Sequence, residues 1–255
     1  MQLFLGQNTY ILTNEGIDCS LPIQGNNQNV CAWYVNPPKI ESVSENGWVG
    51  SVQDGGSVNF RNILFNPHGH GTHTECLGHI TETIYSVNKV EFKLLYKSRV
   101  ITVTPEERIL ENGEIDRVVS RACIPDFSKE EGIDALLFRT LPNTEAKKSM
   151  NYSDSNPVYF DVDIIPLLNE WQIIHLLVDT PSVDREKDGG ELAFHHAFWG
   201  VPDNHRFDRT ITELICLPDE VSDGFYMLNL QTAAFENDAT PSRPLLFPIH
   251  TYEEE

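Results

Sequence analysis

Basic residues are scarce in this chain. Its 255 residues contain 18 lysines and arginines against 38 aspartates and glutamates, which gives a formal net charge of −20. A nucleic-acid-binding surface needs clustered cations that displace counterions from phosphates, and the sequence contains no such cluster. The charge favours solubility and disfavours anionic partners. We therefore expect no nucleic-acid partner.

Long apolar runs and a targeting pattern are also missing. The longest apolar run, IIHLLV at 173–178, is far shorter than the roughly 20 residues that a membrane-spanning helix needs. The first residues, MQLFLGQNTYILTNEG, contain neither a positively charged start nor a small-residue cleavage site, so they do not read as a signal peptide. We expect a cytoplasmic protein with no membrane partner.

Cysteine pairs and several catalytic motifs are missing as well. The five cysteines are odd in number, widely spaced and free of any CxxC pattern. This favours a reduced protein over a disulfide scaffold, with a Cys19–Cys31 bridge as the less favoured alternative. The absence of G-x-S-x-G, Walker and G-x-G-x-x-G motifs removes support for a serine hydrolase, a nucleotide-binding protein or a Rossmann fold.

The composition itself, 40% apolar and 10% aromatic, is that of a globular protein. A length of 255 residues suits one large domain or two small ones. No domain boundary is visible in the sequence, and we assign residues 1–255 to a single domain. Apolar patterns predict strands at 8–14, 89–104, 135–140, 173–178, 210–217 and 225–235. Helices are predicted at 161–172, with Asp161 or Asp163 as N-cap, and at 191–200, ended by Gly200. The mixture predicts an α/β or α+β fold, with a mixed sheet covered by a few helices.

The most unusual stretch is NPHGHGTHTECLGHI at 66–80. It combines a carboxylate and a thiol with four of the chain's nine histidines, namely His68, His70, His73 and His79. Imidazole nitrogens and carboxylate oxygens are the usual ligands of zinc and similar ions, and the interspersed glycines let the chain turn toward one point. A lone histidine is more often structural, but this density predicts a metal site.

Spacing within the stretch suggests which side chains share that site. In an extended segment His73 and Glu75 project to the same side, and His79 lies at even spacing from both. Cys76, at odd spacing, should point away and pack in the core. Structural zinc sites favour cysteines, whereas catalytic sites mix histidine with carboxylate and keep an open position. The mixture therefore favours catalysis.

HGTHTECLGH resembles the signature H-x-G-T-H-x-D-x-P-x-H of the metal-dependent cyclase family, which includes bacterial kynurenine formamidase. Glu75 stands for the family's aspartate, Leu77 for its proline, and His68 matches only if one extra residue is accepted. Weaker resemblances follow in family order at 17–23, 32–38, 135–140, 178–184, 194–199, 211–217 and 237–249. The resemblance implies a swivelling β/β/α-type fold.

The family resemblance also implies one or two divalent ions per chain, with Zn favoured and Mn as the alternative. The implied ligands are His68, His73, Glu75, His195 and Glu213. Two alternatives stay open, which are His70 in place of His68 and His196 in place of His195. The resemblance further implies that His79 is a general acid/base, that Trp33 lines the substrate pocket, and that the chain forms a homodimer or homotetramer.

The resulting hypothesis is a metal-dependent hydrolase, similar to kynurenine formamidase (an arylformamidase of tryptophan catabolism). It would cleave an amide, lactam or lactone bond of a small molecule. A non-catalytic binding protein on the same fold is the main alternative, and a purely structural metal is the weaker one. The stretch GVPDNHRFDRT at 200–210 is partly an insertion relative to the family, and we expect His205 on a surface loop. His175 and Arg243 are expected to be structural.

Overall fold

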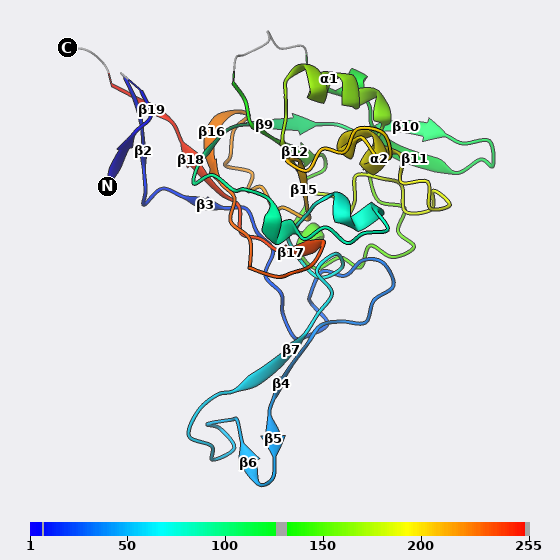
Figure 1. Ribbon diagram of the computed structural model, residues 1–255. Helices are drawn as coiled ribbons and strands as arrows, with labels where there is room; N and C mark the ends of the chain where they lie inside the picture. The colour runs from blue at the N-terminus through cyan, green and yellow to red at the C-terminus, as the bar shows by residue number, and fades with distance from the viewer. Residues whose placement is uncertain (7, 126–131, 253–255) are drawn as a thin grey trace.

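The computed structural model describes residues 1–6, 8–125 and 132–252, and within these ranges its centre is a twisted sheet of nine strands (Figure 1). The four middle strands, β15, β14, β12 and β9, run parallel, and antiparallel strands flank them on both sides. In spatial order the strands are β17 (Ala239–Pro241), β8 (His73–Glu75), β15 (Thr210–Glu213), β14 (His175–Val178), β12 (Ala135–Thr140), β9 (Tyr96–Val103), β16 (Gly224–Asn229), β18 (Leu245–Pro248) and β3 (Ile17–Asp18).

The middle strands are apolar because both of their faces are covered. Every residue of β12 and β14 is buried, as is typical of parallel strands between two layers. Side chains alternate between the faces. Leu136 and Phe138 pack into the core beneath the helices, while Ala135 and Leu137 pack into a second core on the opposite face.

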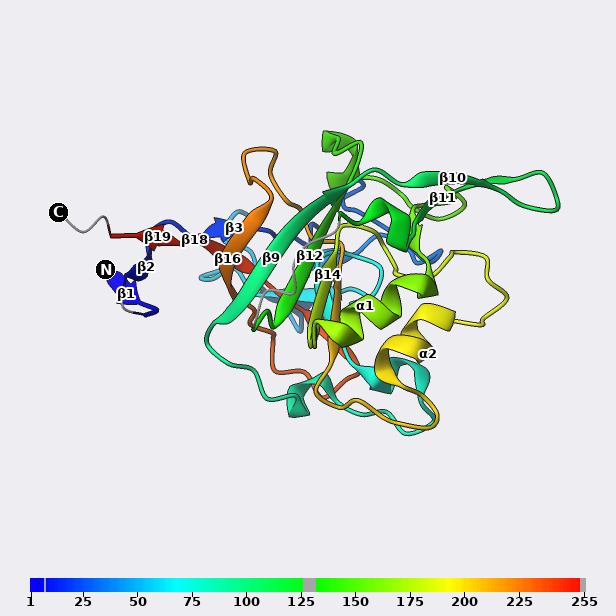
Figure 2. The same cartoon turned by 90° about the horizontal axis from the view of Figure 1, so that it is seen from above.

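Two short helices, α1 (Ile165–Glu170) and α2 (Ala193–Trp199), cover one face of the sheet (Figure 2). The helix predicted at 161–172 is present but shorter than expected. The Asp161 carboxylate accepts a hydrogen bond from the Asp163 N–H and starts a 3₁₀ turn, which leads into α1. Helix α2 ends at Gly200, whose φ of +67° lies in the left-handed region. The mixed sheet and its few helices confirm the predicted fold class.

One predicted strand is partly wrong. Residues 89–104 alternate in polarity, but only β9 joins the sheet, while Val87–Lys89 form a 3₁₀ turn. In the segment before β9, the Lys93 N–H donates to the Tyr96 hydroxyl at 2.6 Å. This local hydrogen bond takes the place of hydrogen bonds to a neighbouring strand. Similarly, β16 ends at Asn229 rather than at 235. All five cysteines are free thiols, so the Cys19–Cys31 bridge is absent.

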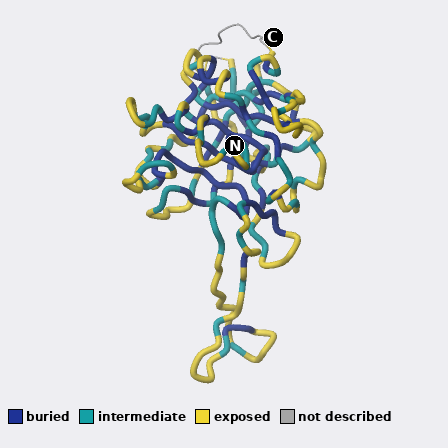
Figure 3. Tube along the Cα trace, turned by 90° about the vertical axis from the view of Figure 1, so that its right-hand side faces the viewer, coloured by how far each residue is buried: buried dark blue, intermediate teal, exposed yellow. Residues whose placement is uncertain are grey.

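Smaller strand groups surround this core. The first comprises β1 (Gln2–Phe4), β2 (Thr9–Leu12) and β19 (His250–Thr251), and the second comprises β10 (Glu106–Ile109), β11 (Ile115–Val119) and β13 (Tyr159–Phe160). A third group, β4 (Lys39–Ser42), β5 (Ser44–Glu45), β6 (Trp48–Val49) and β7 (Arg61–Leu64), projects away from the body as a narrow arm (Figures 1 and 3). No helix in the described ranges has the length and apolar character to cross a membrane.

Candidate metal centre

Strand pairing brings the first two candidate ligands together. His73 on β8 lies directly opposite Glu213 on β15 in the antiparallel register. Opposite residues of such a pair project to the same face, and His73 Nε2 lies 3.4 Å from Glu213 Oε2. Glu75, two residues along β8, projects to the same face. All three side chains are buried, so the sheet carries two carboxylates and an imidazole into a water-poor region.

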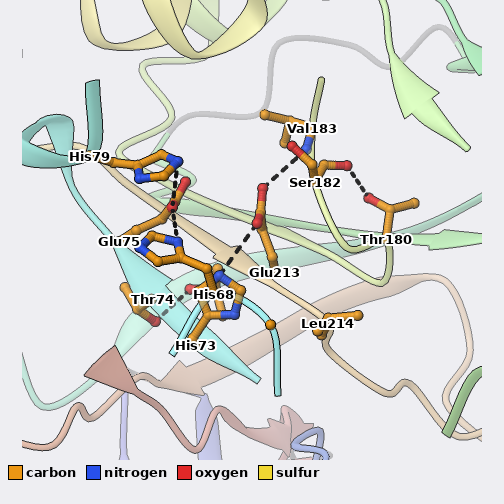
Figure 4. Close-up of polar contacts among 12 residues, drawn as sticks. His68, His73, Thr74, Glu75, His79, Thr180, Ser182, Val183, Glu213 and Leu214 are labelled. Carbon is orange, nitrogen blue, oxygen red and sulfur yellow. Dashed lines mark hydrogen bonds and ion pairs between the residues drawn. The ribbon is translucent and has the colours of Figure 1, made fainter. Parts of the chain in front are cut away.

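Glu75 is the centre of this cluster (Figure 4). Its Oε1 lies 3.0 Å from His195 Nε2, and its Oε2 lies 3.1 Å from His68 Nδ1. His79 Nε2 is 3.9 Å from the same Oε2. Two segments far apart in sequence, residues 68–79 and helix α2, therefore converge on one fully buried carboxylate.

The structure places His68 in the cluster and His70 outside it. Besides contacting Glu75, His68 donates from Nε2 to Asp238 Oδ2 at 2.8 Å. His70 Nδ1 accepts from the Asn66 N–H, and its Nε2 donates to the Asn36 carbonyl. Both nitrogens of His70 are thus engaged by backbone, and its ring links two loops. The turn at residues 66–70 accommodates the extra residue that follows His68.

Of the two neighbouring histidines on α2, the structure brings His195, and not His196, into the cluster. His195 is buried on α2 and aims Nε2 at Glu75, whereas His196 is half-buried and lies against the Val201 carbonyl. Asp184 holds His195 in place by accepting from its Nδ1 at 2.6 Å. The same carboxylate accepts the backbone N–H groups of Phe194 and His195 at the start of α2. One side chain therefore orients both the helix and the imidazole.

His79 reaches the cluster by a route that the extended pattern did not predict. Residues Leu77–Ile80 form a 3₁₀ turn rather than a continuation of β8. The turn stacks the His79 ring on His68, with centroids 4.2 Å apart, and sets Nδ1 at 3.3 Å from Asp238 Oδ2. His79 is the most exposed of the clustered histidines, with 30% of its side chain open to solvent.

The electrostatics of the cluster favour positive charge. Burial alone lowers the pKa of His68, but contacts with Asp238 and Glu75 outweigh it and raise the pKa to about 10. The pKa of His195 also reaches about 10, because Asp184 and Glu75 outweigh burial. Burial raises the pKa of Glu75, but the surrounding imidazoles outweigh it and hold that pKa well below its usual range. The Glu75 carboxylate therefore stays ionised and draws positive charge to this point.

The residues fit a divalent metal ion. His73, His195 and His68 each donate one ring N–H outward, to the Gly71 carbonyl, Asp184 and Asp238 respectively. The other ring nitrogen of each points at Glu75 or Glu213, which is how metal-binding histidines are held by outer partners. Apart from their ion-pair contacts with Glu213 and His68, the buried atoms His73 Nε2 and Glu75 Oε2 have no hydrogen-bond partner among the described residues. Buried polar atoms rarely stay unpaired, and a cation would satisfy both.

Among the described residues, two overlapping sets of ligand atoms have the spacing for an ion. One is His73, Glu75 and Glu213, and the other is His68, Glu75 and His79. Glu75 belongs to both, so the geometry accommodates one ion or two bridged by Glu75. Glu213 is further fixed because its Oε1 accepts the Val183 N–H at 3.0 Å.

A cavity of about 400 Å³ opens onto this cluster. His68, His79, His195 and Glu213 are among its polar lining residues, and Trp33 also lines it. Trp33 has a φ of +60°, which is rare for a bulky residue. Such a strained backbone persists only where its surroundings hold it.

Sequence reasoning missed Asp184 and Asp238 as members of the centre. Both lie in segments, 178–184 and 237–249, that carried a family resemblance, and that was the available signal. The remaining candidates lie elsewhere. Cys76 is buried with its thiol on the Tyr85 carbonyl, Arg243 pairs with Asp18, and His175 and His205 are absent from the residues that line the cavity.

Comparison of the sequence with models of known protein families gives a match to one family. The model of a family described as putative cyclase matches residues 17–185. A search of curated proteins gave no match.

Solved structures similar to this chain share its fold at low identity. A potential metal-dependent hydrolase with cyclase activity has a TM-score of 0.62 and 17% identity, covering 91% of this chain and 96% of its own. A predicted metal-dependent hydrolase from Bacillus stearothermophilus has a TM-score of 0.61 and 18% identity, covering 91% and 97%. An isatin hydrolase bound to the product analogue thioisatinate has a TM-score of 0.59 and 15% identity, covering 92% of both chains.

Proposed function

The chain belongs to the putative cyclase family, and from that premise we propose that it is a metal-dependent hydrolase of small molecules. Its reaction is cleavage of an amide bond, including a lactam, or of a lactone. One observation carries the proposal, namely that imidazoles and carboxylates converge beside a cavity, with two buried ligand atoms that lack a hydrogen bond within the described residues. Similar folds described as metal-dependent hydrolases and an isatin hydrolase support the reaction class.

The ligands we assign are His68, His73, Glu75, His195 and Glu213. Three imidazoles and two carboxylates form a mixed nitrogen and oxygen donor set, which suits Zn²⁺ first and Mn²⁺ second. A bound ion would take the place of the protons that His68 and His195 otherwise carry. A bound ion of this kind supplies Lewis acidity, which makes water nucleophilic near neutral pH and polarises a carbonyl group. Asp184 and Asp238 hold two of the imidazoles in the required orientation.

His79 is the proton carrier in this proposal. Its ring faces the cavity, stacks on His68 and is anchored through Nδ1 by Asp238. An imidazole in this position can take a proton from an attacking water and hand it to a leaving amine. Its larger solvent exposure lets that proton exchange with bulk water after turnover.

Trp33, Val35 and Leu192 provide the apolar part of the cavity wall. A volume of about 400 Å³ lies within the range of roughly 300–1,000 Å³ typical of small-molecule sites. A flat aromatic or heterocyclic amide suits a wall that contains an indole ring, because offset stacking gives attraction beyond burial. N-formyl anilides, the substrate type of an arylformamidase, are therefore the first class to test.

The test combines metal analysis with turnover. Protein purified without added ions and then supplied with Zn²⁺ or Mn²⁺ should hold at least one equivalent and hydrolyse an N-formyl anilide or a lactam. Less than about half an equivalent, with no turnover of any amide, lactam or lactone offered, would contradict the proposal. Tight metal binding without turnover would instead favour a non-catalytic binding protein on the same fold.

A further inference from the structure

A second cavity lies at the end of the sheet where β12 and β14 finish. Thr140 is the last residue of β12, and Asp179 and Thr180 directly follow β14. All three line a cavity of about 160 Å³. Among the described residues, none lines both this second cavity and the cavity at the metal centre. The second cavity is therefore a separate space that the metal centre does not explain.

The wall of the second cavity is largely apolar and rigid. Its apolar lining residues are Leu141, Pro142, Met150, Pro157, Val158 and Pro181. Three of them are prolines, whose φ is fixed, so the wall needs little ordering when a ligand enters. A cavity of roughly 150 Å³ with apolar walls can hold benzene. The second cavity therefore has the size for a single six-membered ring.

Two polar side chains of this lining have no partner within the described part of the chain. Tyr152 is only 7% exposed, but no described residue makes a hydrogen bond to its hydroxyl, which is open to the cavity. Arg117 is exposed on β11, and its guanidinium pairs with no described carboxylate. Burial raises the pKa of Tyr152, and the Arg117 charge opposes this rise, so the two groups are within electrostatic reach. Buried tyrosine hydroxyls usually have a partner, and a ligand would supply one.

The lining of the second cavity is locally positive although the chain is acidic. Its charged residues are Arg117, Lys147 and Asp179. Lys147 Nζ lies 2.8 Å from Asp179 Oδ2 and also donates to the Thr140 carbonyl, so these two charges offset each other. The Arg117 charge remains. An anionic group is therefore favoured at this point, against the net charge of −20 of the whole chain.

We propose that the second cavity binds a small monocarboxylate that carries a flat six-membered ring. The ring occupies the space between the proline side chains. The carboxylate accepts hydrogen bonds from the Arg117 guanidinium, whose parallel N–H groups match its two oxygens, and from the Tyr152 hydroxyl. A phosphate or sulfate ion would leave the apolar wall uncovered, and a neutral ring would leave Arg117 and Tyr152 without a partner.

One short segment connects the second cavity with the metal centre. Residues 179–184 run from one cavity to the other. The Thr180 hydroxyl donates to the Ser182 carbonyl at 2.6 Å, and the Val183 N–H donates to Glu213 at 3.0 Å (Figure 4). A bound carboxylate restricts this segment, so the metal ion meets a Glu213 that is already ordered and binds more tightly. This last step rests on the proposed function, whereas the binding site itself does not.

Methyl NMR of the methionines tests the site without any assay of activity. The chain has three methionines, Met1, Met150 and Met227, and of these Met150 lines the second cavity. Sodium benzoate should shift the Met150 methyl resonance with a Kd of about 1 mM and leave the other two in place. No Met150 shift at roughly 20 times that concentration would overturn the proposal. Equal affinity for benzamide or acetate would also overturn it.

Two substitutions assign the contacts in the same titration. Arg117→Gln should raise the Kd for benzoate about tenfold, and Tyr152→Phe, which removes only the hydroxyl, about fivefold. Arg61→Gln is the matched control, because it removes the same charge from an exposed arginine on β7, outside the second cavity. Its Kd should equal that of wild type. Equal Kd values for Arg117→Gln and Arg61→Gln would overturn the proposed site.

Zinc affinity in the presence of benzoate measures the connection to the metal centre. Saturating benzoate should lower the Kd for Zn²⁺ about fivefold in wild type, measured by competition with a chelator, and should leave it unchanged in Arg117→Gln. The same Kd with and without benzoate in wild type would overturn the connection. If the chain binds no zinc at all, the proposed function fails, while the Met150 titration still decides whether the second cavity binds a carboxylate.

Discussion

His195 and His175 are both buried histidines, but their surroundings give them opposite properties. His195 lies among Asp184, Glu75 and Glu213, and its pKa reaches about 10. His175 lies between Tyr96 and Phe92, with Nδ1 bonded to the Thr210 hydroxyl, and burial lowers its pKa to about 4. Burial alone therefore does not make a functional histidine. The convergent carboxylates mark the site, and they are what a metal ion would require.

The largest expected effect comes from removing the carboxylate shared by both sets of ligand atoms. Glu75→Gln keeps the shape but removes the charge that His68, His79 and His195 face. We expect a loss of kcat/KM of about 10³-fold or more, because losing an outer partner alone costs roughly 10–100-fold. The measurements are turnover and Zn²⁺ affinity by calorimetry. Asp179→Asn is the matched control, since Asp179 is also fully buried but pairs with Lys147 away from the cavity. Equal losses in both variants would contradict the assignment.

His79→Asn separates proton transfer from metal binding. It removes the ring that faces the cavity and leaves the five assigned ligands in place. We expect kcat to fall about 10²–10⁴-fold, the usual contribution of general acid–base catalysis, with an unchanged metal equivalent by elemental analysis. A parallel His205→Asn variant should behave as wild type. If His79→Asn loses its metal instead, His79 is a ligand and not the proton carrier.

Asp184→Asn tests the support of His195. The amide retains the size of the side chain but weakens the charge-assisted bond to His195 Nδ1. We expect metal affinity to fall about 10–100-fold, or roughly 1.4–2.8 kcal/mol, measured by competition with a chelator. Affinity equal to wild type would show that His195 needs no such partner.

The smallest effect concerns His175 and stability. Its folded pKa of about 4 lies below the unfolded value of 6.5, so the unfolded chain takes up the proton first as pH falls. Stability from this group is complete above pH 6.5 and is lost progressively toward pH 4, by about 3 kcal/mol in all.

Urea unfolding at pH 7.5 and 5.0 measures this loss. Wild type should lose about 2 kcal/mol more than His175→Asn, a substitution that cannot titrate and can still bond Thr210. Identical losses in the two proteins would show that His175 does not carry this pH dependence.

Sequence patterns predicted the centre of the fold well. Strands β12 and β14 lie where their apolar runs predict them, because strands buried on both faces are almost entirely apolar. Helix α2 ends where Gly200 predicts its end. The strand expected at 89–95 failed because alternation shows only that a strand is possible. Pairing with a neighbour decides whether it forms, and no local pattern records that.

The candidate metal centre was also predictable only in part, because part of it depends on how distant segments pair. His73 and Glu75 share a face by period alone, but their meeting with Glu213 depends on the register of β8 against β15. The choice of His68 over His70 depends on a turn in which the Asn66 N–H engages His70. The arm gave no sequence signal, because its scattered apolar residues resemble an ordinary strand pattern until the structure shows them uncovered.

The most direct test is an anomalous difference map, at the zinc edge, of crystals grown with Zn²⁺. The strongest peak should lie about 2.0–2.2 Å from His73 Nε2 and from Glu75 Oε2, the two buried atoms of this cluster that have no hydrogen bond to a described residue. Zinc bound only elsewhere, with these two atoms unliganded, would contradict the assignment of this cluster as a metal centre.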